Sequence, residues 1–130
     1  MEKIKVLFVQ EKRARKNFPL LVECFENEAP DTYEMTDVGT KEIIVAKLEE
    51  FKPHIVIIMQ NSRNVNVYDI AQKIKNTFPQ QIIFVSLLDT IGNQEKVIQD
   101  LKDVGVYKCY FSAMLIDTLI HDMYVALNRE

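Results

Sequence analysis

The residues of this chain that could carry catalytic or metal chemistry are few and scattered. Its only cysteines, Cys24 and Cys109, lie far apart and form no Cys-x-x-Cys pair, which favours reduced, structural thiols in the cytoplasm. The two histidines, His54 and His121, have no cysteine or carboxylate at a spacing typical of zinc ligands, and we expect a surface role for His54. No histidine is placed to activate a serine nucleophile. These residues therefore predict neither an enzyme nor a metal site.

Four basic residues in five positions form the densest cluster of charge: Lys12, Arg13, Arg15 and Lys16. A solvated loop before a helix is the simpler interpretation. The alternative is a site for an anion, either a phosphate group or an acidic partner. The whole chain has 16 basic and 19 acidic residues, a net charge of -3, so one short basic patch offers few contacts to nucleic-acid phosphates. Nucleic acid is therefore an unlikely ligand of this domain alone.

The chain contains no recognisable cofactor motif. It has three glycines in 130 residues and neither a dinucleotide-binding nor a P-loop signature. In α/β folds that bind flavin mononucleotide, the loop after the first strand holds the phosphate and is rich in serine, threonine and glycine. Segment 10–16, which follows the first strand-like segment here, contains none of these residues. No apolar run is longer than five residues, which indicates neither a signal peptide nor a membrane span. We therefore expect no cofactor and no membrane contact.

The elements that position these residues alternate between strand and helix patterns. Segments 4–9, 55–59 and 82–88 are rich in β-branched and aromatic residues without alternation, which is typical of strands buried on both faces of a parallel sheet. Segments 33–35 and 107–111 alternate apolar and polar residues, so they suit the two edges of the sheet.

Five further segments carry apolar residues at spacings of three and four, which places those residues on one side of a helix. They are Phe18, Leu21, Val22 and Phe25; Ile44, Leu48 and Phe51; Val67, Ile70, Ala71, Ile74 and Phe78; Val97, Ile98, Leu101 and Val104; and Ile116, Leu119, Ile120, Met123 and Leu127. Asn17, Thr40 and Asn93 can cap helices, and Gly39 and Gly105 can end elements. Strict alternation of five strands and five helices predicts right-handed crossovers and one α/β domain, residues 1–130, with a parallel sheet in the middle of three layers.

With this order of elements, the chain resembles the receiver domains of two-component response regulators over essentially its whole length. Segment 5–11 is similar to the first strand of a receiver, which ends in two acidic residues, and segment 53–59 is similar to the third strand, which follows a proline and ends in the phosphorylated aspartate. Segment 82–86 is similar to the fourth strand, and segment 105–112 to the glycine-led fifth strand with its terminal lysine. The resemblance implies a flavodoxin-like, CheY-like fold with strand order 2-1-3-4-5, which binds ligands at the carboxyl ends of its strands.

The phosphorylation pocket that the resemblance implies is degenerate in this chain. Gln10 and Glu11 stand in place of the acidic pair, Met59 in place of the phosphoacceptor aspartate and Ser112 in place of the lysine, while Ser86 keeps the residue type of the family. A thioether is uncharged and only a weak acceptor, so it cannot act as the carboxylate nucleophile. One remaining carboxylate gives little basis for holding Mg²⁺, which requires an octahedral set of oxygen ligands. We therefore expect a pseudo-receiver without a metal.

The last predicted helix has an apolar patch that its core-facing side does not require. At about 100° per residue, Tyr124 falls at the edge of the core stripe, Val125 lies on the opposite side and His121 falls between them. Isolated exposed apolar residues are common, so chance is one interpretation. The other is a partner surface: receivers use the fourth helix, fifth strand and fifth helix for dimers, and the resemblance implies a two-fold homodimer through this face.

The sequence therefore predicts a non-catalytic, receiver-like module for signalling and protein interaction that works without phosphorylation. Similar atypical receivers precede ParA/MinD-like ATPases or occur in transcription regulators, so an attached ATPase or DNA-binding domain is a further expected partner. Two alternatives stay open. One is a response regulator phosphorylated at an unusual acceptor, such as Glu11 or Asp89, and the other is a sensor of an anionic small ligand that uses the basic cluster.

Overall fold

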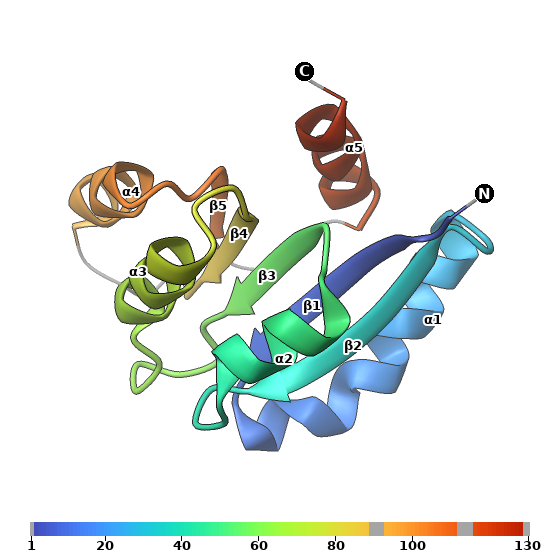
Figure 1. Ribbon diagram of the computed structural model, residues 1–130, viewed down its shortest axis with the longest axis horizontal. Coiled ribbons are helices and arrows are strands. Elements are labelled where there is room, and N and C mark those ends of the chain that lie inside the picture. Colours follow the sequence, from blue (N-terminus) through green and yellow to red (C-terminus); the bar gives the residue numbers. More distant parts are fainter. Residues whose placement is uncertain (1, 89–92, 112–115, 129–130) are drawn as a thin grey trace.

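A computed structural model describes residues 2–88, 93–111 and 116–128 of the chain. Its five strands form one parallel sheet in the order β2-β1-β3-β4-β5, as Figure 1 shows. The strands are β1 (Ile4–Gln10), β2 (Tyr33–Gly39), β3 (Ile55–Met59), β4 (Ile82–Leu87) and β5 (Lys108–Phe111). The predicted order is confirmed, and the two segments with alternating polarity, β2 and β5, lie at the edges of the sheet.

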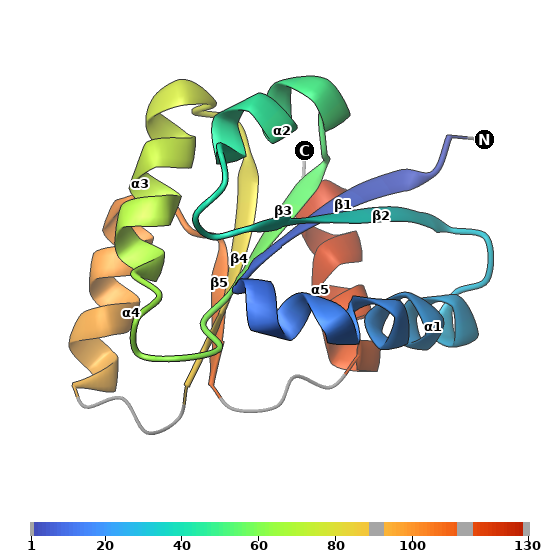
Figure 2. The same cartoon turned by 90° about the horizontal axis from the view of Figure 1, so that it is seen from below.

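Helices cover both faces of the sheet. Figure 2 shows α1 (Phe18–Glu28) and α5 (Ile116–Leu127) on one face, with α2 (Ile44–Phe51), α3 (Val67–Thr77) and α4 (Gln94–Asp103) on the other. A 3-10 helix, η1 (Lys12–Asn17), joins β1 to α1. This is the three-layer, flavodoxin-like arrangement that the sequence predicts.

The central strands are buried because their side chains meet a helix layer on either face. In β1, Val6 and Phe8 pack into the cluster beneath α1 and α5, whereas Leu7 and Val9 pack into the cluster beneath α2, α3 and α4. All four side chains have no exposed surface. Burying an aliphatic or aromatic side chain of this size contributes about 1.5–3 kcal/mol. The core therefore fixes the strand ends, where the candidate site lies.

The predictions for the end of β2 and for the start of α2 are both wrong. The strand extends beyond the predicted residues 33–35 to Gly39, and α2 begins at Ile44, so Thr40 does not cap it. A hydrogen-bonded turn lies between β2 and α2. The backbone N–H of Gly39 donates to Oε1 of Glu42 at 2.7 Å, and the backbone N–H of Glu42 donates to the carbonyl of Gly39 at 3.1 Å. This turn lies beside η1, because Glu42 accepts a hydrogen bond from Arg15 of that helix.

The two predicted asparagine caps stand at the start of α1 and α4 but do not act as caps. Neither Asn17 nor Asn93 accepts a capping hydrogen bond through its side chain. Asn17 continues η1 with helical backbone angles, and Asn93 has a left-handed backbone with φ of 55°, whereas a capping residue is extended. The cap that does form is Asn66, whose Oδ1 accepts from the backbone N–H of Asp69 at 3.1 Å.

Candidate functional site at the carboxyl ends of the strands

Three of the five residues predicted to form the degenerate pocket lie side by side in the sheet. Gln10 and Met59 are the last residues of β1 and β3, and Ser86 is next to last in β4. Met59 pairs with Ser86 in the strand register, and the pairing of β1 with β3 ends one residue before Gln10 and Met59. Glu11 follows β1 directly, while Ser112 lies outside the described residues.

Two polar atoms at the end of β1 are buried without a hydrogen-bond partner in the described part of the chain. They are Nε2 of Gln10, a residue that is 2% exposed, and Oε1 of Glu11. The backbones of both residues are held: the carbonyl of Gln10 accepts from Thr40 at 3.1 Å, and the N–H of Glu11 donates to Oδ1 of Asn61 at 3.4 Å. A buried polar atom without a partner costs about 1–3 kcal/mol, so these two atoms retain capacity for a further contact.

Gln60 fixes the loop that leaves β3. Its buried amide donates to the carbonyl of Val65 at 3.1 Å and accepts from the backbone N–H of Leu88 at 3.2 Å. Its own N–H donates to the carbonyl of Ser86 at 2.9 Å. The sequence patterns assign no role to Gln60 or to Asn61, which holds Glu11. The signal for both is the run of two amide residues directly after a buried strand.

This end of the sheet offers three neutral side chains and one carboxylate. Gln10, Met59 and Ser86 supply an amide, a thioether and a hydroxyl, and Glu11 supplies a carboxylate. Across residues 2–88, 93–111 and 116–128, no three histidine, cysteine, aspartate or glutamate side chains gather as a set of metal ligands. The same described residues include no helix long and apolar enough to span a membrane.

The basic cluster precedes α1, as the simpler prediction has it, but residues 12–17 form η1 rather than an irregular loop. Arg15 is fixed within it: Nε donates to Oδ2 of Asp37 at 2.9 Å, Nη2 donates to Oδ1 of Asp37 at 3.3 Å, and Nη1 donates to Oε1 of Glu42. The hydrogen bond to Asp37 is the main cause of a pKa of Arg15 above its ordinary value. Arg15 therefore joins η1 to β2, while Lys12, Arg13 and Lys16 are exposed.

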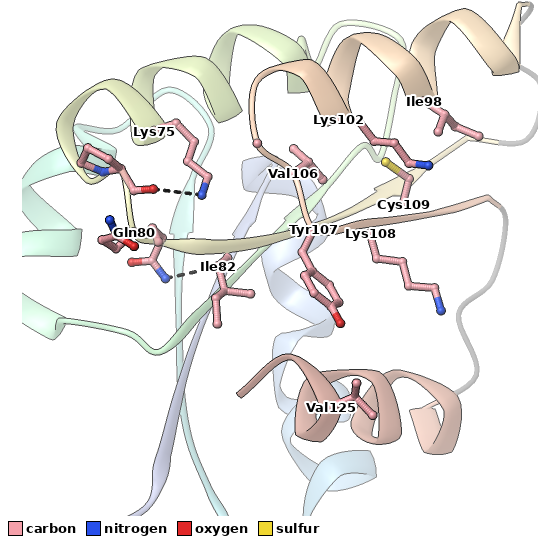
Figure 3. Close-up of a pocket in the computed structure, with 13 residues that line it drawn as sticks. Lys75, Gln80, Ile82, Ile98, Lys102, Val106, Tyr107, Lys108, Cys109 and Val125 are labelled. Carbon is pink, nitrogen blue, oxygen red and sulfur yellow. Dashed lines mark hydrogen bonds between the residues drawn. The ribbon is translucent and has the colours of Figure 1, made fainter. Parts of the chain in front are cut away.

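The predicted patch on α5 is exposed. His121 lies at the surface, Tyr124 is 63% exposed and Val125 is 42% exposed. Of these three residues, Val125 lines an open groove of about 910 Å³ beside the edge strand β5. Figure 3 shows that Ile98 and Lys102 of α4 lie on one side of β5 and Val125 of α5 on the other. The three elements of the predicted dimer face therefore meet around one groove.

The remaining predicted surface residues have simple environments. His54 is exposed, as expected, and its Nδ1 accepts a 2.9 Å hydrogen bond from the backbone N–H of Lys5 at the start of β1. Both cysteines are free thiols. Cys109 is half-buried in β5, but Cys24 is exposed on α1, so the expected structural role is wrong for Cys24.

Comparisons with known proteins identify the fold. No protein-family model and no curated protein matches the chain. Solved structures do match: a CheY-like response regulator receiver domain from Methanospirillum hungatei has a TM-score of 0.76 and 13% identity, with 98% of this chain and 96% of that chain covered. The signal receiver domain of a DNA-binding response regulator from Colwellia psychrerythraea has a TM-score of 0.73 and 16% identity, covering 98% and all of the two chains.

A third similar structure is larger. NtrX from Brucella abortus has a TM-score of 0.71 and 16% identity, and the match covers 98% of this chain but 28% of that chain. The same fold is thus one part of a longer protein there. The structural neighbours are response regulator receiver domains, and this chain has their CheY-like fold.

Proposed function

We propose that this chain is a pseudo-receiver: a cytoplasmic, non-catalytic signalling module that acts through protein contacts and is not phosphorylated. The observation that carries the proposal is the end of β3, where Met59 occupies the strand terminus between Gln10 and Ser86. In the receivers that the sequence resembles, this terminus bears the phosphoacceptor aspartate. A thioether provides neither a nucleophilic carboxylate nor a hard ligand for Mg²⁺.

The neighbouring residues support the same conclusion. Of the four described pocket residues, Gln10, Glu11, Met59 and Ser86, only Glu11 carries a negative charge. The exposed Lys12 and Arg13 follow it immediately. These cations disfavour the approach of a divalent metal ion. If only one acidic residue of a receiver pocket were replaced, the remaining carboxylates would still repel one another. Replacement of most of the acidic residues together removes that repulsion.

Beryllofluoride, a phosphoryl mimic, tests this proposal. Amide NMR spectra of the chain are recorded with magnesium and beryllofluoride, with an ordinary receiver as the positive control. We expect no magnesium-dependent shifts around Gln10, Met59 and Ser86. Strong shifts there would instead favour the alternative of a response regulator with an unusual acceptor, such as Glu11 or Asp89; Asp89 lies outside the described residues.

We also propose that the protein contact includes a two-fold homodimer through α4, β5 and α5, with His121, Tyr124 and Val125 at its centre. The exposed side chains of Tyr124 and Val125, of which Val125 lines the open groove, support this choice, because covering them removes apolar surface from water. A partner protein or an attached domain, such as an ATPase or a DNA-binding domain, would then carry the output.

Sedimentation equilibrium tests the dimer. We expect a dimer at high micromolar concentration, and a monomer after Tyr124→Ser with Val125→Ser. Leu20→Ser is the matched control, because Leu20 on α1 is 62% exposed, as Tyr124 is 63% exposed, but lies away from this face. A monomeric native chain, or a dimer that both sets of substitutions weaken equally, would refute this face.

A further inference from the structure

We infer that a cavity between η1 and the turn after β2 binds a small phosphorylated molecule that also carries a hydroxyl or amino donor. The cavity has a volume of about 520 Å³ and lies beside the carboxyl end of β1, on the side of the edge strand β2. Small-molecule sites typically occupy about 300–1,000 Å³. This site goes beyond the proposed function, since it involves neither Met59 nor the face formed by α4, β5 and α5.

The charge of the cavity wall favours an anion. Four cationic side chains line it, from Lys12, Arg13, Arg15 and Lys41, against two acidic ones, from Glu11 and Glu42. Arg15 already forms ion pairs with Asp37 and Glu42. The charges of the cavity wall that remain unpaired are therefore those of Lys12, Arg13, Lys41 and Glu11. Lys12, Arg13 and Lys41 form no ion pair within the described residues, and all three are exposed. Three like charges around one cavity are mutually repulsive, and a bound phosphate relieves that repulsion.

A second observation, independent of the basic residues, concerns Glu11. Its Oε1 atom has almost no accessible surface and no hydrogen-bond partner among the described residues, and Glu11 is one of the residues that line the same cavity. A rotation of the Glu11 side chain is needed to turn this oxygen toward a ligand. An unpaired carboxylate oxygen requires a donor. The O–H donors of inorganic phosphate belong to the same group that the cations bind. The hydroxyl groups of a sugar phosphate or the ribose of a nucleotide supply a separate donor while the phosphate stays on the cations. The wall therefore combines phosphate-binding cations with one acceptor for a neutral part of the ligand.

The walls of the cavity are held in place before any ligand arrives. Arg15 joins η1 to Asp37 of β2 through two hydrogen bonds, and Glu42 accepts from both Arg15 and the backbone N–H of Gly39. The N–H of Thr40 donates to the carbonyl of Gln10 at 3.1 Å, which joins the turn to β1. A site whose backbone is already ordered loses less conformational entropy on binding.

Lys16 provides a matched control within the same helix. It carries the same charge as Lys12, is also exposed and lies in η1, but it does not line the cavity. If binding merely followed the overall charge of the cluster, Lys16 would matter as much as Lys12. If binding follows the cavity, Lys41 matters more than Lys16, although Lys41 lies far from the cluster in sequence.

The experiment titrates the full chain with inorganic phosphate, ribose 5-phosphate and adenosine 5′-diphosphate at constant ionic strength, followed by amide NMR. We expect ribose 5-phosphate to bind more tightly than inorganic phosphate and to shift the amides of Gly39, Thr40 and Lys41. Lys41→Gln should weaken this binding at least tenfold, Lys16→Gln should change it less than twofold, and Glu11→Gln should remove the advantage of ribose 5-phosphate. Dispersed amide spectra show that each variant is folded.

The ligands and variants separate the outcomes. Tighter binding of adenosine 5′-diphosphate than of ribose 5-phosphate identifies a nucleotide as the ligand, and equal binding identifies a sugar phosphate. Failure of all three ligands to shift these amides overturns the inference. Equal losses in Lys16→Gln and Lys41→Gln also overturn it, since they indicate non-specific charge attraction. Equal binding of phosphate and ribose 5-phosphate to the native chain overturns the role of Glu11 and with it the proposed ligand class.

Discussion

The hydroxyl of Tyr110 donates a 2.6 Å hydrogen bond to Oδ2 of Asp122, and so joins the edge strand β5 to α5. Lys108 donates to the same oxygen at 2.9 Å. The Tyr110 ring is half-buried and stacks on Phe84 at 6.2 Å between centroids. The helix α5, which carries the exposed patch, is therefore held to the sheet by hydrogen bonds as well as by apolar packing.

Removal of the Tyr110 hydroxyl tests that link. Tyr110→Phe leaves Asp122 with one donor fewer, and we expect a loss of about 1–2 kcal/mol in the free energy of unfolding, measured by urea denaturation. Tyr33→Phe is the control, because the Tyr33 hydroxyl makes no hydrogen bond among the described residues and we expect less than about 0.5 kcal/mol of change. Similar losses in the two variants would contradict a specific role for the Tyr110 hydroxyl.

The same link makes stability depend on pH. Burial raises the pKa of Asp122, but the hydrogen bonds from Lys108 and Tyr110 outweigh it and hold that pKa below the ordinary value of 3.8. A carboxylate with a depressed folded-state pKa contributes stability above its unfolded-state pKa, and the contribution is lost as the pH falls through the folded-state value. The difference in unfolding free energy between the native chain and Asp122→Asn should thus be constant near neutral pH and shrink below about pH 4. A difference that grows on acidification would show the opposite sign and exclude this cause.

Arg15 is expected to stabilise the fold, unlike the other basic residues of η1. Arg15→Ala leaves the largely buried carboxylate of Asp37 without its bidentate partner, and we expect a loss of about 1–3 kcal/mol in unfolding free energy. Arg15→Lys should recover only part of it, since an ammonium group cannot reproduce the two-point contact. Lys16→Ala should cost less than about 0.5 kcal/mol. Thermal denaturation of the three variants measures this order, and an equal effect of Lys16→Ala would contradict it.

Gly105 ends α4 with φ of +100°, where a side chain is strained and an added Cβ would lie 2.9 Å from Cε of Lys75. We expect Gly105→Ala to cost about 1–2 kcal/mol, measured by urea denaturation. Repeating the substitution in a Lys75→Ala background separates the two causes. The contact with Lys75 disappears there while the backbone strain persists, so most of the cost should remain. Complete rescue by Lys75→Ala would show that strain is unimportant.

The sequence predicts the layers and the strand order of this protein because local patterns determine them. The unbroken apolar runs of β1, β3 and β4 require cover on both faces, and the shorter alternating segments can only lie at the edges. The extent of β2 was missed, because residues 36–39 lack the apolar alternation of its first residues and are held by pairing with β1 instead.

Some residues of the candidate sites could also be predicted from local patterns, and others could not. Gln10, Met59 and Ser86 could be placed together because each stands at or near the end of a buried strand. The partners of Arg15 could not, since Asp37 and Glu42 lie 22 and 27 residues away and meet it only after β2 pairs with β1. Lys41 was missed for the same reason: it joins the basic cavity through the turn after β2, not through any spacing along the chain.

Intact-mass spectrometry after incubation with acetyl phosphate and magnesium tests most directly whether the end of β3 offers a phosphoacceptor. An ordinary receiver treated in parallel should gain the mass of one phosphoryl group. We expect the native chain to gain none. Phosphorylation of the native chain that hydroxylamine removes, as it removes an acyl phosphate of aspartate or glutamate, would contradict the proposal of a pseudo-receiver.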